Sequence, residues 1–443
     1  MKKNFFDFLK NYKSINMSSF HTPGHKCNVG DFSDIYNLDF TELPCTDSLY
    51  EASGIIKDAE KRLTKLYKTD GSFFSSGGNT LCIQAMFRLI ANEGENVICD
   101  RLIHRSAVCA AALLGINLVW LNRHINCESR LSERLDVNEL NKKLCQKNSF
   151  KGIYLTSPSY HGILQDVQLI SRKGLKMDIP VIVDNAHGSH LKFLNKDLHP
   201  LAHGATMTAD SAHKTLPVLT GGAWLHINRK KYVIQAKSAM ALFGSTSPSY
   251  PTMASMDWAV QWLTENALNE FKKLEEKVLE IKYMAEKKGI YIPNHSISDP
   301  TRISLGVFKI GYTGYEVRDI LHKYLIEPEM CDENYVVLIP TPFNTDEDWK
   351  RLKNFLNNLK IKKETPSNIF KEVPLPEICV SLREAIMSDS VCVSVNDSLN
   401  RIAAEVVCPC PPGIPVVMPG EKIGSIQQEL LIRYGILKIN VLK

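Results

Sequence analysis

Two segments that lie thirty residues apart carry the side chains with the most specific chemistry in this chain. In the first, an apolar run ends in a carboxylate, Asp184, and in the second, Lys214 follows a Ser-x-His sequence that begins at Ser211. Pyridoxal phosphate (PLP) chemistry requires both groups, because a lysine amine holds the aldehyde covalently and a carboxylate keeps the pyridine nitrogen protonated. Either residue alone is typical of an ordinary exposed charge. Together they predict a PLP site.

A phosphate site is predicted at the start of a helix, in Ser75-Ser-Gly-Gly-Asn-Thr80. Glycines let the backbone approach an anion closely, and the free N–H groups and dipole of a helix start attract phosphate. Gly78, Asn79 and Thr80 are therefore candidates for phosphate contacts. A plain helix cap produces a similar sequence, so this segment supports the prediction without establishing it alone.

Further contacts to the cofactor are expected from residues near the two main segments. His104 follows a predicted strand, where an imidazole can stack on the pyridine ring and move protons; a loop histidine bonded to backbone is the alternative. Ser211 and His213 flank the lysine, so they can reach the phosphate while Lys214 reaches the aldehyde. Ser159 is a candidate for the ring hydroxyl.

The overall composition indicates a soluble globular protein without a nucleic-acid or membrane partner. The chain has 443 residues, 44% of them apolar and 23% charged, and the net charge of +5 comes without a basic tract. No apolar stretch approaches the length of a membrane span. Residues 1–10 read as a short amphipathic helix and not as a signal peptide.

The twelve cysteines include no CxxC pair. They are expected to be reduced thiols, which indicates a cytoplasmic protein. The tightest pair, Cys408-Pro-Cys410, has no second cluster that would support a metal site. It is interpreted as loop structure, and no metal is predicted.

Helices and strands alternate from about residue 50 to residue 260. Strands are predicted at 96–100, 117–121, 152–156, 180–184, 205–209 and 222–227, and helices at 52–67, 79–92, 106–114 and 136–147. Short apolar strands separated by helices favour an α/β fold with a mostly parallel sheet covered on both faces. Ligands of such sheets bind at the carboxyl ends of the strands, where Asp184 falls.

A second, smaller α+β region follows a long helix predicted at 257–288. Its predicted elements are a strand at 302–309, a helix at 315–325, a strand at 335–340 and a helix at 346–359. We therefore expect four parts: an N-terminal segment (1–50), a PLP-binding large domain (51–290), a small α/β domain (291–363) and a C-terminal domain (364–443).

These segments, taken in order, resemble the Orn/Lys/Arg decarboxylases, which are PLP enzymes of fold type I. The resemblance runs nearly end to end and is carried by residues 21–26, 76–80, 104–106, 157–162, 184–188, 211–226, 246–257 and 411–421. Any one segment would be a weak signal, but together they are specific. The chain resembles a short form of the family, without the additional N-terminal wing domain of the large members.

The resemblance implies roles for individual residues. Lys214 would bind the aldehyde, Asp184 would pair with the pyridine nitrogen and His104 would stack on the ring. The expected remaining cofactor contacts are Gly78, Asn79, Thr80, Ser159, Ala186, His187, Ser211, His213 and, from a neighbouring subunit, Thr246. A homodimer or dimer of dimers with composite sites is implied, and large rings are not expected.

Two departures from the family pattern affect finer contacts. The phosphate turn reads Ser76-Gly-Gly-Asn-Thr80 where large members have Asn-Gly-Thr-Ser-Thr, and Cys410 replaces a common tyrosine before Pro-Pro-Gly. The individual phosphate and substrate contacts therefore stay open.

The activity implied by the resemblance is decarboxylation of a basic L-amino acid (lysine, arginine or ornithine) to a di- or polyamine precursor. The proton added at Cα would come from Lys214 or His104. Glu405 or Glu421 would bind the distal cation. An aminotransferase or lyase of the same fold type is an alternative, and so is an inactive PLP-binding regulatory paralogue. The sequence does not distinguish the three basic substrates.

Overall fold

A seven-stranded sheet is the central element of the structure. The computed structural model describes residues 17–20, 24, 42, 46–123, 126–132, 134–146, 149–362, 375–408 and 415–443. The strands are β2 (Gly71–Ser75), β3 (Asn96–Asp100), β4 (Asn117–Leu121), β5 (Phe150–Thr156), β6 (Val181–Asp184), β7 (Met207–Asp210) and β8 (Ala223–Ile227). Their order is β2-β8-β7-β6-β5-β3-β4. Only β8 runs opposite to its neighbours, so the predicted mostly parallel α/β sheet is confirmed.

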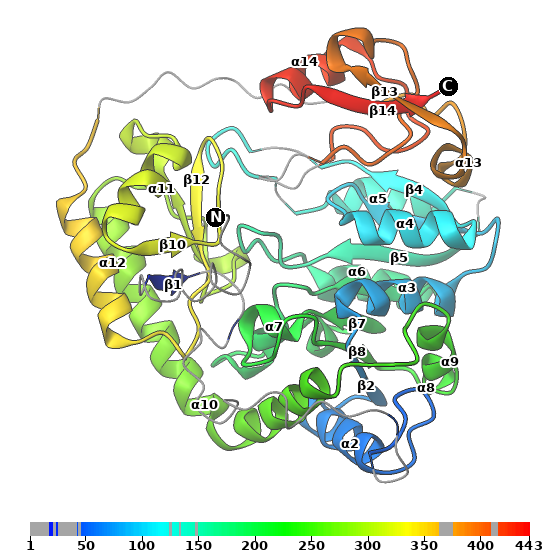
Figure 1. Cartoon of the computed structure of the whole chain (residues 1–443), viewed down its shortest axis with the longest axis horizontal. Coiled ribbons are helices and arrows are strands. Elements are labelled where there is room, and N and C mark those ends of the chain that lie inside the picture. The colour runs from blue at the N-terminus through cyan, green and yellow to red at the C-terminus, as the bar shows by residue number, and fades with distance from the viewer. Residues whose placement is uncertain are drawn as a thin grey trace, which may run out of the picture.

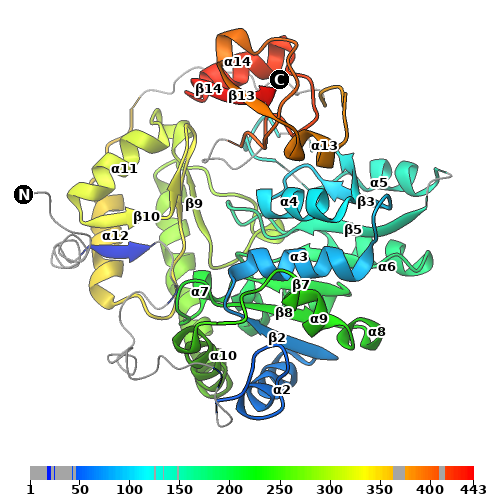
Figure 2. The same cartoon turned by 45° about the vertical axis from the view of Figure 1, so that its right-hand side comes forward.

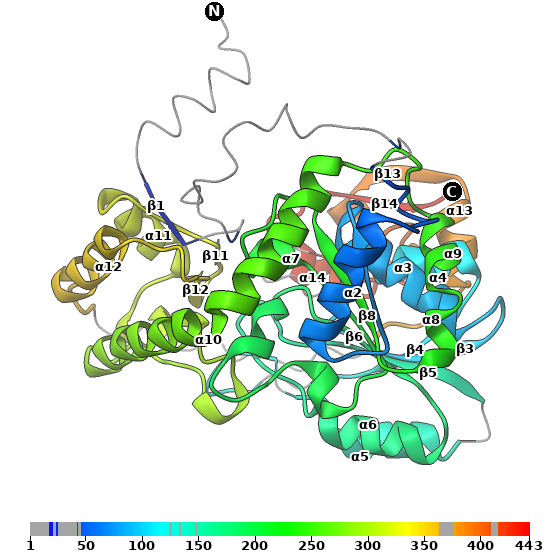
Figure 3. The ribbon, with the colours of Figure 1, turned by 90° about the horizontal axis from the view of Figure 1, so that it is seen from below.

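Helices cover both faces of this sheet (Figure 3). One face packs against α3 (Gly78–Ile90), α4 (Arg105–Leu114) and α9 (Ala236–Ala241). The other face packs against α5 (Val137–Leu144) and α6 (Val167–Lys176). Because both faces are covered, β6, β7 and β8 are buried along their whole length.

The helix boundaries follow capping residues, and one of these caps is not local. Helix α2 (Ile55–Tyr67) begins three residues later than predicted. The Asp47 carboxylate accepts the N–H groups of Gly54 at 2.8 Å and Ile56 at 3.1 Å, so it satisfies the helix start from outside the helix. Helix α4 ends at Gly115, which adopts a left-handed conformation with φ of 69°. The edge strand β2 was not among the predicted strands.

Helix α10 (Tyr250–Lys287) connects the large sheet to the smaller unit. It starts seven residues before its predicted start, because Ser249 caps it by accepting the N–H of Thr252 at 3.4 Å. Apolar residues of α10, α2 and the smaller unit form one continuous hydrophobic cluster. Figure 1 shows the smaller unit to the left of the large sheet, with α10 running from below the sheet to that unit.

The smaller unit contains a three-stranded antiparallel sheet. Its strand order is β11-β12-β9, and it is flanked by α11 and α12. The bounds are β9 Ile303–Gly306, β10 Ile326–Pro328, β11 Met330–Cys331, β12 Tyr335–Leu338, α11 Gly314–Lys323 and α12 Asp346–Asn358. Strand β1 (Ser18–Phe20) pairs in parallel with β10. The strand predicted at 302–309 is shorter, because the chain continues as a 3-10 turn over Val307–Ile310.

The C-terminal unit packs above α4 in Figure 1. It contains α13 (Leu382–Met387), α14 (Ser425–Arg433) and an antiparallel pair, β13 (Ser390–Ser394) with β14 (Lys438–Leu442). Among the described residues, no helix is both long and apolar enough to cross a membrane. The helix predicted at 1–10 and most of the segments at 21–26 and 409–414 lie outside the described residues.

Candidate active site

The carboxyl ends of neighbouring strands bring the two main predicted residues to one edge of the sheet. Asp184 is the last residue of β6 and is paired in register with Thr156 of β5 and Ala209 of β7. Lys214 lies in the short helix α7 (Ala212–Thr215), directly after β7. In Figure 2, α7 sits at this end of the sheet, facing the smaller unit.

Asp184 is held by three donors, and its side chain is almost fully buried. Its Oδ1 accepts from the Asn79 side-chain amide at 2.8 Å and from the Ala186 N–H at 3.1 Å, and its Oδ2 accepts from the Tyr154 hydroxyl at 3.2 Å. Burial raises the pKa of Asp184, while the charges of His104 and Lys214 oppose that rise. The Asn79 side chain and the Ala186 N–H therefore orient the acid. A phosphate contact from Asn79 would use its backbone N–H or the second hydrogen of its side-chain amide.

Lys214 contacts two aromatic rings. Its Nζ donates to Nε2 of His187 at 3.1 Å and lies 5.7 Å from the centre of the Tyr160 ring. The pKa of His187 lies well below its usual value, because the ring is buried and the positive charges of Lys214 and Arg302 disfavour a further charge. A neutral His187 can accept the hydrogen bond from the lysine amine.

His104 is the N-cap residue of α4. Its Nδ1 accepts from the Ser106 N–H at 3.2 Å, which leaves the proton of the neutral ring on Nε2. His104 is exposed as a residue, but surrounding protein atoms still lower the pKa of its ring by desolvation, and Lys214 lowers it further against the opposing effect of Asp184. The three predicted catalytic residues are therefore within electrostatic reach of one another, and their roles at the cofactor stay predictions.

The turn before α3 has the form of an anion cradle, but Gly78 contributes differently from the prediction. Its N–H donates to the Gly221 carbonyl at 2.8 Å, so it is not available to a phosphate. Its φ of 68° is a conformation that side chains other than glycine rarely adopt, and this allows the turn. The N–H groups of Asn79 and Thr80, in the first helical turn, remain the donors without an intrahelical acceptor.

Three further predicted contacts have defined environments. His213 donates from Nδ1 to the Gly222 carbonyl at 3.0 Å, so Nε2 is an acceptor in the neutral ring and donates to a phosphate only when the ring is protonated; burial lowers the pKa of the ring. Ser211 is buried at the N-cap of α7, and its hydroxyl makes no capping hydrogen bond. Ser159 accepts from the Ile163 N–H at 3.1 Å, which leaves its own hydroxyl proton to donate. An amine, a buried acid, an imidazole and several anion donors fit the reactive groups of PLP.

Within the described residues, no hydrogen bond or ion pair joins the remaining predicted residues to Lys214 or Asp184. Thr246 is exposed in the turn before α10. Glu405 is exposed in the C-terminal unit, where it accepts from the Asn440 N–H at 3.0 Å. Glu421 is buried and forms two contacts with Arg101, at 2.5 and 2.8 Å. Arg101 compensates the charge of Glu421. Glu421 is therefore not available to a substrate cation, in contrast to the prediction.

Comparison with known proteins agrees with this geometry. Residues 3–290 match the family description "Orn/Lys/Arg decarboxylase, major domain", and residues 367–437 match "Orn/Lys/Arg decarboxylase, C-terminal domain". The chain belongs to the Orn/Lys/Arg decarboxylase family. It is therefore a PLP-dependent amino-acid decarboxylase, and the resemblance of the motifs is confirmed.

Several relatives of this decarboxylase align over nearly its whole length. Two are from Bacillus subtilis (strain 168): a protein named "Uncharacterized protein YaaO" (29% identical; 96% of this chain, 93% of that one) and an arginine decarboxylase (28% identical; 94% and 90%). The constitutive lysine decarboxylase of Escherichia coli (strain K12) is 20% identical, with 97% and 76% covered.

Solved structures similar to this decarboxylase show its fold. The lysine decarboxylase of Francisella novicida has a TM-score of 0.76 at 19% identity, covering 94% of this chain and 76% of that one. Ureidoglycine-glyoxylate aminotransferase from Bacillus subtilis has a TM-score of 0.60 at 14% identity, covering 78% and 95%. The fold is that of fold-type I PLP enzymes, as predicted.

The decarboxylase also contains an acid near the site that sequence reasoning missed. The charge of Glu329, which follows β10, raises the pKa of both His213 and Arg302 against the lowering effect of their burial. Arg302 itself is buried and donates to the carbonyls of Tyr160 at 3.4 Å and His187 at 3.2 Å. No local signal marked it, because β10 reads Ile326-Glu-Pro328 and was not among the predicted strands.

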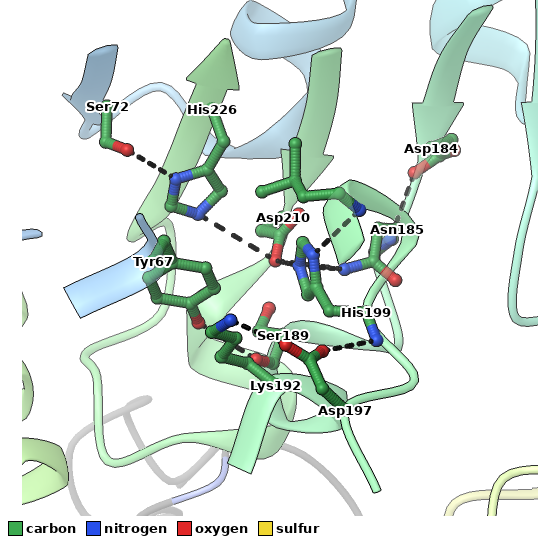
Figure 4. Close-up of polar contacts among 12 residues, drawn as sticks. Tyr67, Ser72, Asp184, Asn185, Ser189, Lys192, Asp197, His199, Asp210 and His226 are labelled. Carbon is green, nitrogen blue, oxygen red and sulfur yellow. Dashed lines mark hydrogen bonds and ion pairs between the residues drawn. The ribbon is translucent and has the colours of Figure 1, made fainter. Parts of the chain in front are cut away.

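A buried polar network lies beneath the site of the decarboxylase (Figure 4). The Oδ2 atom of Asp210 accepts from the Asn185 amide at 3.0 Å and from His199 Nε2 at 2.8 Å. Burial acts to raise the pKa of Asp210, but His199, His226 and Asn185 outweigh it and hold the pKa below its usual value. Asn185 follows Asp184, and Asp210 precedes Ser211. The network therefore holds the ends of β6 and β7 together.

Proposed function

We propose that this decarboxylase removes the α-carboxylate of a basic L-amino acid as CO2 and produces the corresponding di- or polyamine precursor. The observation that carries the proposal is that Lys214 and Asp184, the latter fixed by Asn79, Tyr154 and Ala186, lie at the same edge of the sheet in a chain of this family. Glu329, which lies on the smaller unit directly after β10 and whose charge acts on His213 and Arg302, is the acid that we propose to interact with the distal cation.

The residues that would hold the cofactor follow from the site geometry. Lys214 would hold the aldehyde carbon, and Asp184 would pair with the pyridine nitrogen. Ser211, His213 and the N–H groups at the start of α3 would bind the phosphate, and His104 would lie against the ring. When bound, PLP supplies a protonated ring that accepts the electrons left behind by CO2.

Hydrogen bonds within the chain orient the groups that would act on the cofactor and the substrate. The donors Asn79, Tyr154 and Ala186 fix both oxygens of Asp184, so the carboxylate can stabilise a proton on the ring nitrogen. Neutral His187 accepts from the Lys214 amine and fixes its direction. The bond between Cα and the carboxylate carbon breaks. Cα then receives a proton from Lys214 Nζ or from His104 Nε2.

A composite site is part of the proposal. Thr246 is exposed just before α10, which suits a contact with the phosphate bound by a second copy of the chain. A homodimer, or a dimer of dimers, would complete both sites, and we expect the enzyme to act in the cytoplasm.

The test is to incubate the purified chain with PLP and with L-lysine, L-arginine or L-ornithine, and to identify the amine by mass. L-arginine is the first substrate to test, because the relatives at 27–28% identity that carry an assigned activity are arginine decarboxylases. Release of CO2 with one of the three amines is expected. Amination of 2-oxo acids in preference to CO2 release would instead favour an aminotransferase, whose fold is similar.

A further inference from the structure

The Arg101–Glu421 pair joins the C-terminal unit to the loop that carries His104. The two side chains are 8% and 2% exposed, and their contacts are bidentate, at 2.5 Å and 2.8 Å. Arg101 also lies 5.1 Å from the centre of the Trp120 ring. Glu421 accepts the Met418 N–H at 2.8 Å. The two Arg101–Glu421 hydrogen bonds have a fixed geometry, and they therefore define how the C-terminal unit is placed on the large unit.

A buried ion pair is a poor way to add stability, because desolvation of both charges offsets much of their attraction. The gain from this geometry is orientation. Met418, three residues before Glu421, packs in the hydrophobic cluster that α3 and α4 form with the sheet. The segment around Glu421 is thus inserted into the large unit and does not merely rest on its surface.

The C-terminal unit also contacts the opposite end of α4. Arg383, in α13, donates from Nη1 to the carbonyls of Leu113 at 2.8 Å and Ala112 at 3.3 Å. These carbonyls belong to the last turn of α4, where a cation also interacts favourably with the helix dipole. Figure 2 shows α13 beside α4, in agreement with these bonds.

The helix held at both ends begins at the residue that faces the cofactor. His104 is the N-cap of α4, and the N–H of Ile103 donates to the Arg101 carbonyl at 3.0 Å, so Arg101 and His104 belong to one tight turn. A shift of the Arg101 side chain moves this turn, and the turn sets the direction of the imidazole.

We propose that the C-terminal unit positions His104 by holding α4 between the Arg101–Glu421 pair and Arg383. Arg101, Glu421 and Arg383 are positioning residues, and none of them is assigned a contact with substrate. The inference rests on the proposed function in one respect, namely that His104 acts at the bound cofactor. The Pro-Gly-Glu421 motif, which has no role in the proposed chemistry, would then act in positioning His104.

The test is a double substitution, Arg101→Met with Glu421→Gln, in the full chain. Removing both charges avoids a lone buried charge, and Gln retains an acceptor for the Met418 N–H. The pKa of His104 is measured without PLP, from the pH dependence of hydrogen exchange at its imidazole carbon by mass spectrometry. We expect this pKa to rise toward 6.5, because the protein atoms that now desolvate the ring would no longer be held around it. We also expect faster amide exchange over residues 104–108.

The kinetic expectation is a fall in kcat on the order of 10²-fold, as for a misplaced catalytic group, with KM unchanged. The matched control is Arg433→Gln. Arg433 also joins the C-terminal unit to the rest of the chain, through Glu333 at 3.2 Å, but this pair is exposed. An exposed pair contributes little, so the control should match the wild type in exchange and in kcat.

An unchanged pKa and unchanged exchange in a folded double variant would overturn the proposal. If the double variant does not fold, Arg383→Gln tests the other contact. It should speed exchange at 110–115 and lower kcat, and wild-type behaviour would again overturn the proposal. A wild-type chain that releases no CO2 would contradict the proposed function, whereas the exchange measurements would still decide whether the C-terminal unit positions His104.

Discussion

Asn79 and Asp184 are 105 residues apart in the chain, and their side chains are joined by a hydrogen bond of 2.8 Å. This bond connects the first turn of α3 with the end of β6. It therefore links the helix start expected to bind phosphate with the acid expected to face the pyridine nitrogen. The two ends of the cofactor would be bound by parts of the chain that fix one another.

Asn79→Ala should weaken catalysis more than it weakens folding. A hydrogen bond to a charged group contributes about 1.5–3 kcal/mol, so kcat/KM should fall roughly 10- to 150-fold. Steady-state kinetics and a PLP titration measure the effect. Asn92→Ala is the control, because Asn92 is exposed beyond the other end of α3 and bonds only to Glu95 among the described residues. Equal kinetics in both variants would show that Asn79 has no role in catalysis.

Lys214→Ala should abolish covalent retention of PLP and reduce turnover by several orders of magnitude, because the attachment point and a proton donor are lost together. Borohydride treatment of the wild-type protein, followed by peptide mass analysis, should find the label on Lys214. Label on another lysine would contradict the assignment.

Glu329→Gln should raise KM for the basic substrate while PLP affinity stays unchanged. Loss of one charged partner costs about 1–3 kcal/mol, or roughly 5- to 150-fold in kcat/KM. The pKa of His213 should also fall further, because Glu329 now raises it. Glu327→Gln is the matched control, since Glu327 lies two residues earlier and contacts His322 at 3.2 Å. If both variants keep the wild-type KM, another acid binds the distal cation.

Thr246→Trp and Lys214→Ala should each be inactive alone and partly active when mixed. If Thr246 acts in the partner's site, a mixed dimer holds one site with both defects and one with neither. Activity after subunit exchange, against each variant alone, is the measurement. No recovery after demonstrated exchange would mean that each site is built within one chain.

Acidification should destabilise the network beneath the site. Burial lowers the pKa of His226 to about 3, against 6.5 in its absence. The unfolded chain therefore binds an additional proton between these values, and the free energy of unfolding falls by up to about 1.4 kcal/mol per pH unit as pH drops below 6.5. The lowered pKa of Asp210 acts in the same direction at more acidic pH. Urea unfolding of His226→Gln should show a shallower pH dependence than the wild type, and an equal slope would contradict this origin.

The sequence was sufficient to predict where Asp184 and Lys214 lie, because parallel strands place their carboxyl ends at one edge of a sheet. Their roles at the cofactor stay predictions. The turn before α3 was also recognisable, but its hydrogen bonds were not. Whether the Gly78 N–H faces a ligand or the Gly221 carbonyl depends on a loop 143 residues away.

Contacts between units had no local signal. Glu421 looked like a candidate for the substrate cation because its motif was specific, yet its partner is Arg101, 320 residues away. The edge strand β2 was missed because it pairs only with β8, the one strand of this sheet that runs opposite to the others. Glu329 could be recognised only from the structure, in which its charge acts on His213 of the large unit.

The network under Asp184 determines which strands unfold together. Asp210, His199 and Asn185 tie together the ends of β6 and β7, and His226 extends the network through the Ser72 hydroxyl, at 2.7 Å, to the edge strand β2. Strands joined in this way separate as one cooperative unit of unfolding, not singly. The acid and lysine side of the site thus belongs to this cooperative unit, while the imidazole side is held by contacts with the C-terminal unit, which lie outside the network.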